Sequence, residues 1–415
     1  MVSRDAGLIM GAMDQRHDVV IVGGGLVGAS LAIALDGSGL DVGLVESAPA
    51  GRAPPVFDQR NLSFAAATVQ ALTTLGVMRH LAAPAGPIRR IHVSRQGDFG
   101  RVLLQASDHG REAFGQVVVA SDFGRALESR LGELPRLTRY RPARFLGLAD
   151  AGQGDDRSMR LHTDAGEVSL QARLLVGADG THSSVRTALG IGADEHDFQQ
   201  TLLVARMRAA QAPDGTAYER FGPDGPTALL PRGDRHFGVV HGVPREQADA
   251  VATLDDHQWL ARVQGAFGWR VGRFAATGER SAYPIVQVVA RRTTAPRAVL
   301  LGNAAQTLHP IGAQGFNLGL RDALLLAELL ANAGDPADPS LLQAHASRRA
   351  ADRERALAFS SGLARLTAND TPLAAGLRSL GLMAAAASLA LQSSLVGGAM
   401  GFGEDVPVLC REPIV

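Results

Sequence analysis

Residues 18–28 read DVVIVGGGLVG, an apolar run that leads directly into a glycine-rich turn. Gly23, Gly25 and Gly28 have the spacing G-x-G-x-x-G, and Glu46 stands about 20 positions further on. In dinucleotide-binding proteins the first glycine makes the tight turn, the second admits the pyrophosphate and the third lets the helix pack on the strand, while the acidic residue accepts hydrogen bonds from the adenosine ribose. The stretch therefore predicts a β-α-β unit that binds a dinucleotide. A glycine-rich turn without a ligand is the alternative that the motif alone leaves open.

Two later segments also place small residues after a buried strand. An apolar strand over 174–176 leads into GADGTHSSVR at 177–186, where Asp179 separates the strand from a helix and, from pattern alone, fits a helix-capping role. An apolar strand over 298–301 leads into GNAAQTLHPIGAQGFNLGLRDA at 302–323. The glycines of this last segment let the backbone approach a flat polar group, and the N–H groups of the following helix favour negative charge.

The remaining pattern predicts helices at both ends of the chain and a sheet-rich middle. Apolar spacing predicts helices over 61–75, 121–134 and 318–333, and a polar helical region over 339–366. Short apolar runs between charged and Gly/Pro turns predict strands over 88–93, 101–104, 200–208, 227–230, 237–241 and 272–274.

The composition excludes several functions. The chain of 415 residues has 41 basic and 41 acidic residues, so we expect no nucleic-acid partner. All of the basic residues are Arg, which excludes a lysine Schiff base and a phosphate-loop lysine. Cys410 is the single cysteine, so neither an intrachain disulfide nor a cysteine metal site can form, and we expect no metal and a reducing, cytoplasmic location.

The stretch 379–403 contains no charged residue. Its length would suit a membrane span, but it consists mostly of Ala, Gly and Ser and contains Gln392. We therefore expect a packed or membrane-surface helical hairpin rather than a span. The beginning of the chain, residues 1–17, lacks the long apolar core of a signal peptide.

The three glycine-rich segments together resemble the flavin-binding signatures of the single-component aromatic hydroxylases of the p-hydroxybenzoate hydroxylase type. Within that group the chain is most similar to the ubiquinone-biosynthesis hydroxylases, in the branch of the octaprenyl-methoxyphenol hydroxylases. This similarity rests on DQRNLSFAAATVQALTTLGV at 58–77, GNAAQTLHP at 302–310, NDTPLAAGLRSLGLMAAAAS at 369–388 and AMGF at 399–402. The resemblance extends over nearly the whole chain, from residue 18 to residue 402.

The resemblance implies an α/β fold, with a Rossmann-like FAD-binding domain, an inserted antiparallel β-sheet substrate domain and a C-terminal helical region. The expected boundaries are 14–80, 116–195 and 286–335 for the three parts of the FAD-binding domain, 81–115 and 196–285 for the substrate domain, and 336–415 for the helical region.

The resemblance also assigns residues to the cofactor. The ADP half of FAD would be held by the first motif, Gly23, Gly25, Gly28 and Glu46. Arg125 stands where the family places a polar side chain on the cofactor, although its position on a predicted amphipathic helix is by itself typical of a solvated surface arginine. Asp179 matches the motif that the family uses for both FAD and the pyridine nucleotide.

The third segment would bind the flavin half. Asn303 stands where most relatives have an Asp that contacts the ribityl chain, and Pro310 would lie beside the isoalloxazine. The pyrimidine edge would meet Gly315, Phe316 and Asn317.

One departure from the family pattern concerns the backbone beside the flavin. Relatives usually read Ala-Gly-Gln-Gly where this chain reads GAQG over 312–315, so Ala313 replaces a glycine. If this position requires a positive φ, alanine costs about 1 kcal/mol or more.

The implied activity is the FAD-dependent monooxygenation of a polyprenylated phenol in ubiquinone biosynthesis. NADPH or NADH would reduce the flavin, and it would bind transiently because no second G-x-G-x-x-G follows a strand. O2 would then form a flavin C4a-hydroperoxide that attacks the ring, so the site must exclude water. No catalytic side chain is required; we expect His309 to be structural and Tyr283 to line the substrate pocket.

Such a substrate is too apolar to reach the site through water, so the expected partners are the membrane surface, at the inner face of the plasma membrane, or other ubiquinone-biosynthesis proteins. Two alternatives stay open. A hydroxylase of a soluble aromatic acid or secondary metabolite would use 379–403 as a dimer contact in a homo-oligomer, and a non-catalytic subunit of a ubiquinone-synthesis complex would keep FAD for structure alone.

Overall fold

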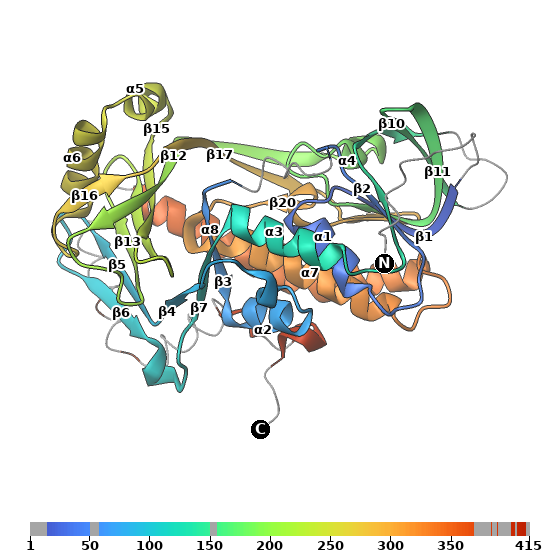
Figure 1. Cartoon of the computed structure of the whole chain (residues 1–415), viewed down its shortest axis with the longest axis horizontal. Coiled ribbons are helices and arrows are strands. Elements are labelled where there is room, and N and C mark those ends of the chain that lie inside the picture. Colours follow the sequence, from blue (N-terminus) through green and yellow to red (C-terminus); the bar gives the residue numbers. More distant parts are fainter. Residues whose placement is uncertain are drawn as a thin grey trace.

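The computed structural model describes residues 15–49, 58–149, 156–368, 383, 388, 400–402 and 405–411. Two large sheets dominate the described chain, and the long strands β12 and β17 run along the molecule from one to the other (Figure 1). This arrangement confirms the expected α/β fold with a largely antiparallel sheet beside a nucleotide-binding domain.

The first sheet has parallel strands at its centre. Residues 19–22 of β1 are at most 4% exposed, because helices and strands cover both faces of the sheet, as an uninterrupted apolar run requires. The strand order is β18-β19-β11-β1-β2-β8, and the pairs of β1 with β2 and β11, β2 with β8, and β11 with β19 are parallel. Its strands are β1 (Gln15–Val22), β2 (Val42–Val45), β8 (Leu137–Tyr140), β9 (Ala143–Leu148), β10 (Arg157–Thr163), β11 (Gly166–Gly177), β18 (Thr294–Ala295) and β19 (Ala298–Leu300).

Six helices accompany this sheet and the small sheet beside it. The core joins α1, α3 and α7 to the strands through side chains such as Leu31, Phe123 and Leu320, each fully buried. The helices are α1 (Leu26–Ala34), α2 (Ala66–Thr74), α3 (Ala120–Leu131), α4 (Ser184–Ala188), α7 (Gln314–Leu330) and α8 (Pro339–Ala368).

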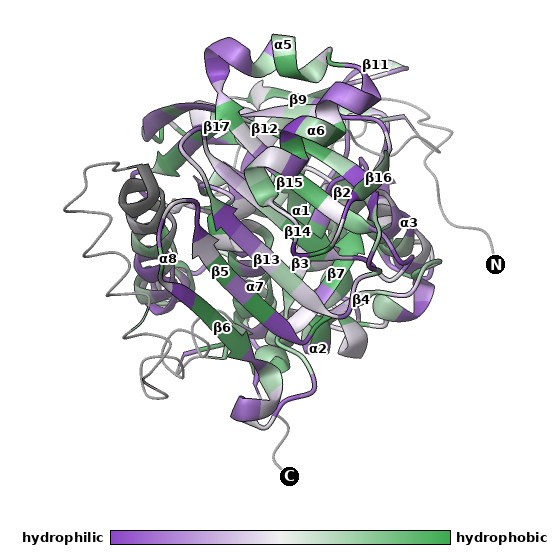
Figure 2. Ribbon diagram, turned by 90° about the vertical axis from the view of Figure 1, so that its left-hand side faces the viewer, coloured by the Kyte–Doolittle hydropathy of each residue, from purple (hydrophilic) through white to green (hydrophobic). Residues whose placement is uncertain are grey.

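The second sheet is largely antiparallel and has one face covered by helices. Its order is β20-β17-β12-β15-β14-β13-β5-β6, with β16 also paired to β12. Apolar and polar residues alternate along β5, β6 and β13 (Figure 2), which is typical of a sheet whose two faces have different surroundings. Its strands are β5 (Arg90–Arg95), β6 (Arg101–Gln105), β12 (Ala193–Ala209), β13 (Thr216–Phe221), β14 (Pro226–Pro231), β15 (Phe237–Pro244), β16 (Phe274–Thr277), β17 (Ser281–Ala290) and β20 (Gln306–Thr307), and its covering helices are α5 (Ala248–Ala252) and α6 (Asp256–Phe267).

A third, three-stranded sheet lies between these parts. It consists of β3 (Asn61–Ala65), β7 (Gly115–Val119) and β4 (Gly86–Ile88), in that order. Short 3-10 turns occur at Met78–His80, Ala106–His109, Arg245–Gln247, Gly302–Ala304, Ile311–Ala313 and Val408–Cys410.

The predicted helix over 61–75 is wrong in its first part. Residues Asn61–Ala65 form β3 and pair antiparallel with β7, and the helix begins only at Ala66. The pairing with a distant strand prevails over local helix propensity here. The helix predicted from residue 318 begins earlier, at Gln314, and so includes Gly315 in its first turn.

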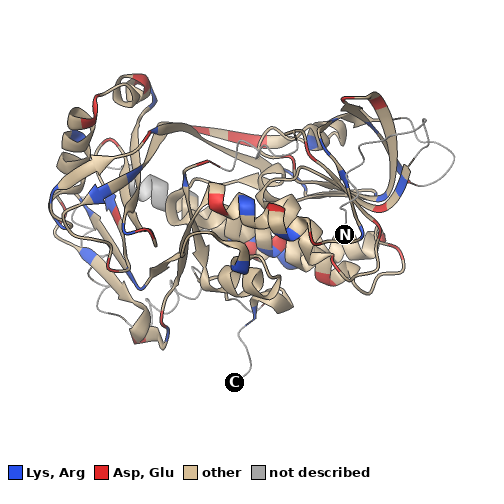
Figure 3. Cartoon of the chain, viewed as in Figure 1, with Lys and Arg blue, Asp and Glu red and all other residues tan. Residues whose placement is uncertain are grey.

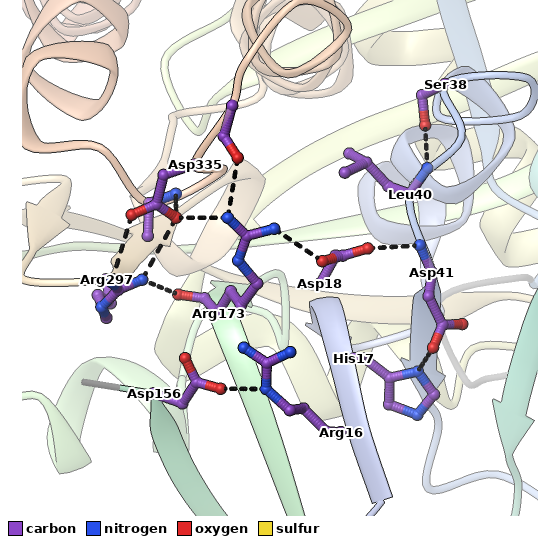
Figure 4. A network of polar contacts seen from close by, with 12 residues as sticks. Arg16, His17, Asp18, Ser38, Leu40, Asp41, Asp156, Arg173, Arg297 and Asp335 are labelled. Carbon is purple, nitrogen blue, oxygen red and sulfur yellow. Dashed lines mark hydrogen bonds and ion pairs between the residues drawn. The ribbon is translucent and has the colours of Figure 1, made fainter. Parts of the chain in front are cut away.

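A network of ion pairs joins β1 and β11 to the loop after α7 (Figure 4). The Arg173 guanidinium on β11 pairs with Asp18 of β1 at 3.0 Å and with Asp335 at 3.3 Å, and Arg297 pairs with Asp335 at 3.3 Å. Arg173 also donates to the Gly334 carbonyl at 2.9 Å. These contacts fix the centre of the parallel sheet relative to α7.

Charges of both signs are distributed over both parts of the molecule (Figure 3). None of the helices in the described ranges is long and apolar enough to cross a membrane. The helical hairpin expected over 379–403 lies almost entirely outside the described residues.

Candidate functional site

A cavity of about 850 Å³ lies between the two large sheets. Its wall is formed on one side by the ends of β1, β2 and β11 and by the turn before α7, and on the other side by the sheet that contains β12–β15. The volume is in the upper part of the roughly 300–1,000 Å³ that small-molecule and cofactor sites occupy.

The glycines of the first motif form a turn that no side chain could enter. Gly23 has a φ of +107°, and a Cβ there would lie 2.4 Å from the Ala178 carbonyl oxygen. A Cβ on Gly28 would lie 1.9 Å from the Gly23 carbonyl oxygen, so the helix can pack on the turn only with glycine at this position. Gly25 precedes α1 and lines the cavity.

Glu46 is held at the end of β2, on the cavity wall. Its carboxylate accepts hydrogen bonds from the Gly24 N–H at 2.9 Å and from the Ala48 N–H at 2.7 Å. No side chain caps the start of α1, whose first residues Leu26 and Val27 face the cavity. An uncapped helix start beside a glycine turn and a fixed carboxylate fits the pyrophosphate and ribose of a dinucleotide such as FAD.

Asp179 lines the same end of the cavity and also holds the following turn together. Its carboxylate accepts hydrogen bonds from the Val185 N–H at 3.1 Å and from the Ser183 hydroxyl. Ser183 in turn caps α4 by accepting from the Arg186 N–H at 2.9 Å. The capping role expected from pattern is therefore present, together with a position on the cavity wall.

The third glycine-rich segment forms the middle of the wall. Asn303, Pro310, Gly315 and Phe316 all line the cavity. The Phe316 ring packs against Phe64, with the ring centroids 5.3 Å apart, so the start of α7 is supported from β3.

Asn317 is the member of this predicted set that does not line the cavity. Its side chain is 2% exposed and accepts from the Ala65 N–H at 2.9 Å. It also donates to the carbonyls of Ser63, at 3.0 Å, and Ala313, at 2.8 Å. The side chain is thus committed to holding β3 against the start of α7.

Ala313 has a left-handed backbone, with φ of 51° and ψ of 36°. Gly312 beside it also has a positive φ, of 75°. Position 313 therefore has the positive φ for which the sequence analysis expected alanine to cost conformational energy.

The structure does not bring Arg125 to the cavity. The residue lies on α3, its side chain is 64% exposed, and its guanidinium pairs with Asp122 at 3.1 Å. Its assignment to the cofactor rests on the resemblance alone.

Tyr283 lies on the cavity wall, where a small polar cluster holds it. Its hydroxyl donates to Asp58, and the Arg60 guanidinium lies 4.3 Å from the centre of its ring. Burial and the hydrogen bond to the Asp58 carboxylate raise the pKa of Tyr283. Burial opposes the charge of Asp58, but hydrogen bonds from Arg60 and Tyr283 lower its pKa. Asp58 is therefore ionised, and its carboxylate accepts from both residues.

His309 and Glu219 also line the cavity. His309 is 1% exposed, and burial lowers its pKa to about 4, so the ring is neutral. Its Nδ1 accepts from the Ile311 N–H at 3.3 Å, which leaves the proton on Nε2. Glu219, on β13, was missed by sequence reasoning; the signal was the alternation of TAYERF over 216–221, which places Glu219 on the face shared with Ala217 and Phe221.

Comparisons with known proteins agree with this geometry. A family model described as an FAD binding domain matches residues 16–360. The chain is 32% identical to the ubiquinone hydroxylase UbiL of Rhodospirillum rubrum over 98% of this chain and 95% of the relative. It is 30% identical to the 3-demethoxyubiquinol 3-hydroxylase of Escherichia coli, over 94% and 99%. The fold matches the crystal structure of p-nitrophenol 4-monooxygenase PnpA from Pseudomonas putida with a TM-score of 0.78 at 18% identity, over 94% of this chain and all of that one.

Proposed function

The chain belongs to the family of FAD-dependent hydroxylases that includes the ubiquinone hydroxylases, and from this premise we propose that it hydroxylates the ring of a polyprenylated phenol in ubiquinone biosynthesis. The observation that supports this most directly is one cavity that extends from the dinucleotide turn, past the start of α7, to a largely apolar sheet face. When bound, FAD supplies the redox chemistry with O2, after reduction by NADPH or NADH.

The residues that would hold FAD lie along one wall. Gly23, Gly25 and the start of α1 would hold the pyrophosphate, and Glu46 would hold the ribose. Asp179, Asn303 and Pro310 follow along the same wall, and Gly315 and Phe316 would lie beside the flavin ring. Arg125 is left out of this set because it does not line the cavity and its exposed guanidinium pairs with Asp122.

The protein contributes position, charge and the exclusion of water. The start of α7 beside Gly315 has no side-chain cap, so its N–H groups would be free to stabilise negative charge on a bound flavin. The apolar sheet face opposite, with Leu202 and Val204, keeps water from the reacting ring. Tyr283, held by its hydrogen bond to Asp58, would border the substrate from the first residues of β17.

The first test is the visible absorption spectrum of the purified protein, followed by NADPH oxidation with and without a short-chain prenylated methoxyphenol. Bound-flavin absorption and oxidation that the phenol stimulates, with a hydroxylated product by mass spectrometry, are expected. A protein that stays colourless after incubation with FAD would refute the proposal. Hydroxylation of small aromatic acids but not of the prenylated phenol would support the soluble-substrate alternative instead.

A further inference from the structure

One carboxyl group interrupts the apolar face that the β12–β15 sheet turns toward the cavity. Side chains of Ile91, Leu202, Val204, Ala217, Ala228 and Val240 form this face. Glu219 of β13 is the only acidic residue among the described residues that this sheet contributes to the wall.

The surroundings of Glu219 within the sheet are apolar. Val93 of β5 and Ala228 of β14 stand directly beside it in the strand register. The side chains of its two neighbours along β13 make contacts with α6 on the other face of the sheet. The centroids of the Tyr218 and Phe267 rings lie 5.5 Å apart, and Arg220 donates to the Ala266 carbonyl at 3.2 Å. The carboxyl group therefore faces the cavity, and the charged residue that β5 adds to the same face is Arg95, which stands beside Phe221, two residues further along β13.

No residue in the described ranges donates a hydrogen bond to Glu219 or pairs with it, and burial by itself raises its pKa to about 7. The other ionisable groups at this end of the cavity are neutral or engaged: burial raises the pKa of Tyr218 and keeps it neutral, Arg60 and Tyr283 bind Asp58, and His309 is neutral. At the nucleotide end the ionisable lining residues are Glu46, Arg144 and Asp179. A carboxyl group left without a partner in an apolar wall is costly, and a polar group of the ligand would offset that cost.

We propose that Glu219 binds the free hydroxyl of the phenolic substrate and accepts its proton. This inference rests on the proposed function and assigns a base to its reaction. The O–H bond of the phenol breaks, the proton bonds to a carboxylate oxygen of Glu219, and the electron pair stays on the phenolic oxygen. The resulting phenolate ring is richer in electrons and is therefore more reactive toward an electrophilic oxygen. When the product forms, Glu219 returns the proton to the phenolic oxygen, so no further reactant is needed.

The test compares the FAD-loaded wild-type protein with Glu219→Gln, Glu219→Asp and, as a control, Glu195→Gln, an exposed residue of β12. The probe is the short-chain prenylated methoxyphenol. Its ionisation on the protein is read without turnover, from the ultraviolet difference spectrum of the oxidised complex, because a phenolate absorbs at longer wavelength than a phenol. The kcat and KM for hydroxylation are measured in parallel, as are the FAD content and the pH profile of kcat/KM.

The expected result is a phenolate spectrum for the wild type and the control, and a neutral phenol spectrum for Glu219→Gln. The kcat of Glu219→Gln falls about 100-fold, the size of effect typical of a lost general base, while its FAD content and KM stay near the wild-type values. Glu219→Asp regains part of the phenolate spectrum. A Glu219→Gln variant that keeps both the phenolate spectrum and the wild-type kcat overturns the inference.

The same spectra separate this inference from the proposed function. A wild-type protein that binds the phenol as a phenolate but never hydroxylates it would refute the function and support the role of Glu219. A wild-type protein that hydroxylates the phenol but binds it only in its neutral form would support the function and overturn the role of Glu219.

Discussion

Ala313 stores backbone strain beside the cavity, and glycine would remove it. Its φ of 51° lies in the left-handed region, where Cβ is unfavourable. We predict that Ala313→Gly raises the free energy of unfolding by about 1 kcal/mol, measured by urea denaturation. The matched control is Ala331→Gly at the end of the same helix, where φ is −57° and glycine should lower stability by roughly 0.5–1 kcal/mol. Destabilisation by both substitutions would contradict the assignment of strain to Ala313.

Glu219 should make the free energy of unfolding depend on pH, whereas glutamine at this position should not. Burial raises the pKa of Glu219 in the folded protein to about 7, above its unfolded value. The free energy of unfolding therefore falls as pH rises from the unfolded pKa through the folded pKa. We predict that Glu219→Gln is no more stable than wild type near pH 4.5 but is more stable at pH 8, by about 3 kcal/mol at most. Thermal melting of the FAD-loaded, substrate-free protein measures this. The exposed Glu195→Gln should show no such trend, and a Glu219→Gln difference that is constant across pH would refute the raised pKa of Glu219.

At the scale of elements, a buried ionic cluster joins α7 to α8. The Asp322 carboxylate accepts from Arg349 Nε at 2.6 Å and from Gln306 Nε2 at 2.8 Å, and the Asp352 carboxylate accepts from Arg321 Nε at 2.7 Å and also from Arg349. Burial opposes the charge of Asp352, but Arg321 and Arg349 lower its pKa to about 2. This cluster holds α8 against α7, the helix whose first residues line the cavity.

We predict that Asp352→Asn lowers the free energy of unfolding by roughly 3–5 kcal/mol at pH 7, because it leaves the buried Arg321 without a counter-charge and leaves Arg349 with Asp322 alone. Since the folded pKa of Asp352 lies below the unfolded one, its contribution is complete above about pH 4 and is lost as pH falls toward 2. The difference from wild type in urea midpoints should therefore shrink between pH 4 and pH 3. Glu354→Gln, an exposed position on the same helix, should change stability by less than about 0.5 kcal/mol. An equal effect of the two substitutions would argue against a structural role for the cluster.

The elements that sequence predicts best are those whose signal is local. The turn at Gly23–Gly28 and the third glycine-rich segment could be recognised because their glycines, strand and helix are adjacent in the chain. The strand β3 could not, because its contact through Asn317 joins residues 252 positions apart. The role of Gln306 is likewise non-local, since its side chain is 3% exposed and lies between Asp322 and Arg353. Glu219 could not be recognised as a site residue from the sequence, because the sequence does not show which face of the sheet borders the cavity.

At the scale of the whole molecule, the polyprenyl chain of the proposed substrate needs a route from a lipid surface to the cavity. The charge-free stretch 379–403 is the sequence feature best suited to lie on such a surface, since apolar area buried at the interface drives binding of this kind. Its end is anchored in the fold, because Met400 is buried with Val102 and Phe114. Substitutions within the stretch are therefore a cleaner test than its complete removal.

We predict that the double variant Leu391→Glu and Leu395→Glu co-sediments at least threefold less with vesicles of mixed zwitterionic and anionic phospholipids, while its flavin absorption is unchanged. Two charges in an apolar membrane contact oppose insertion, whereas the described residues that line the cavity belong to other segments of the chain. The control is Trp269→Ala, which removes a 70% exposed aromatic side chain from the turn between α6 and β16. If the tryptophan variant loses vesicle binding and the leucine variant keeps it, the lipid contact belongs to the end of the molecule that bears α5 and α6, and the substrate would enter from the side of the antiparallel sheet.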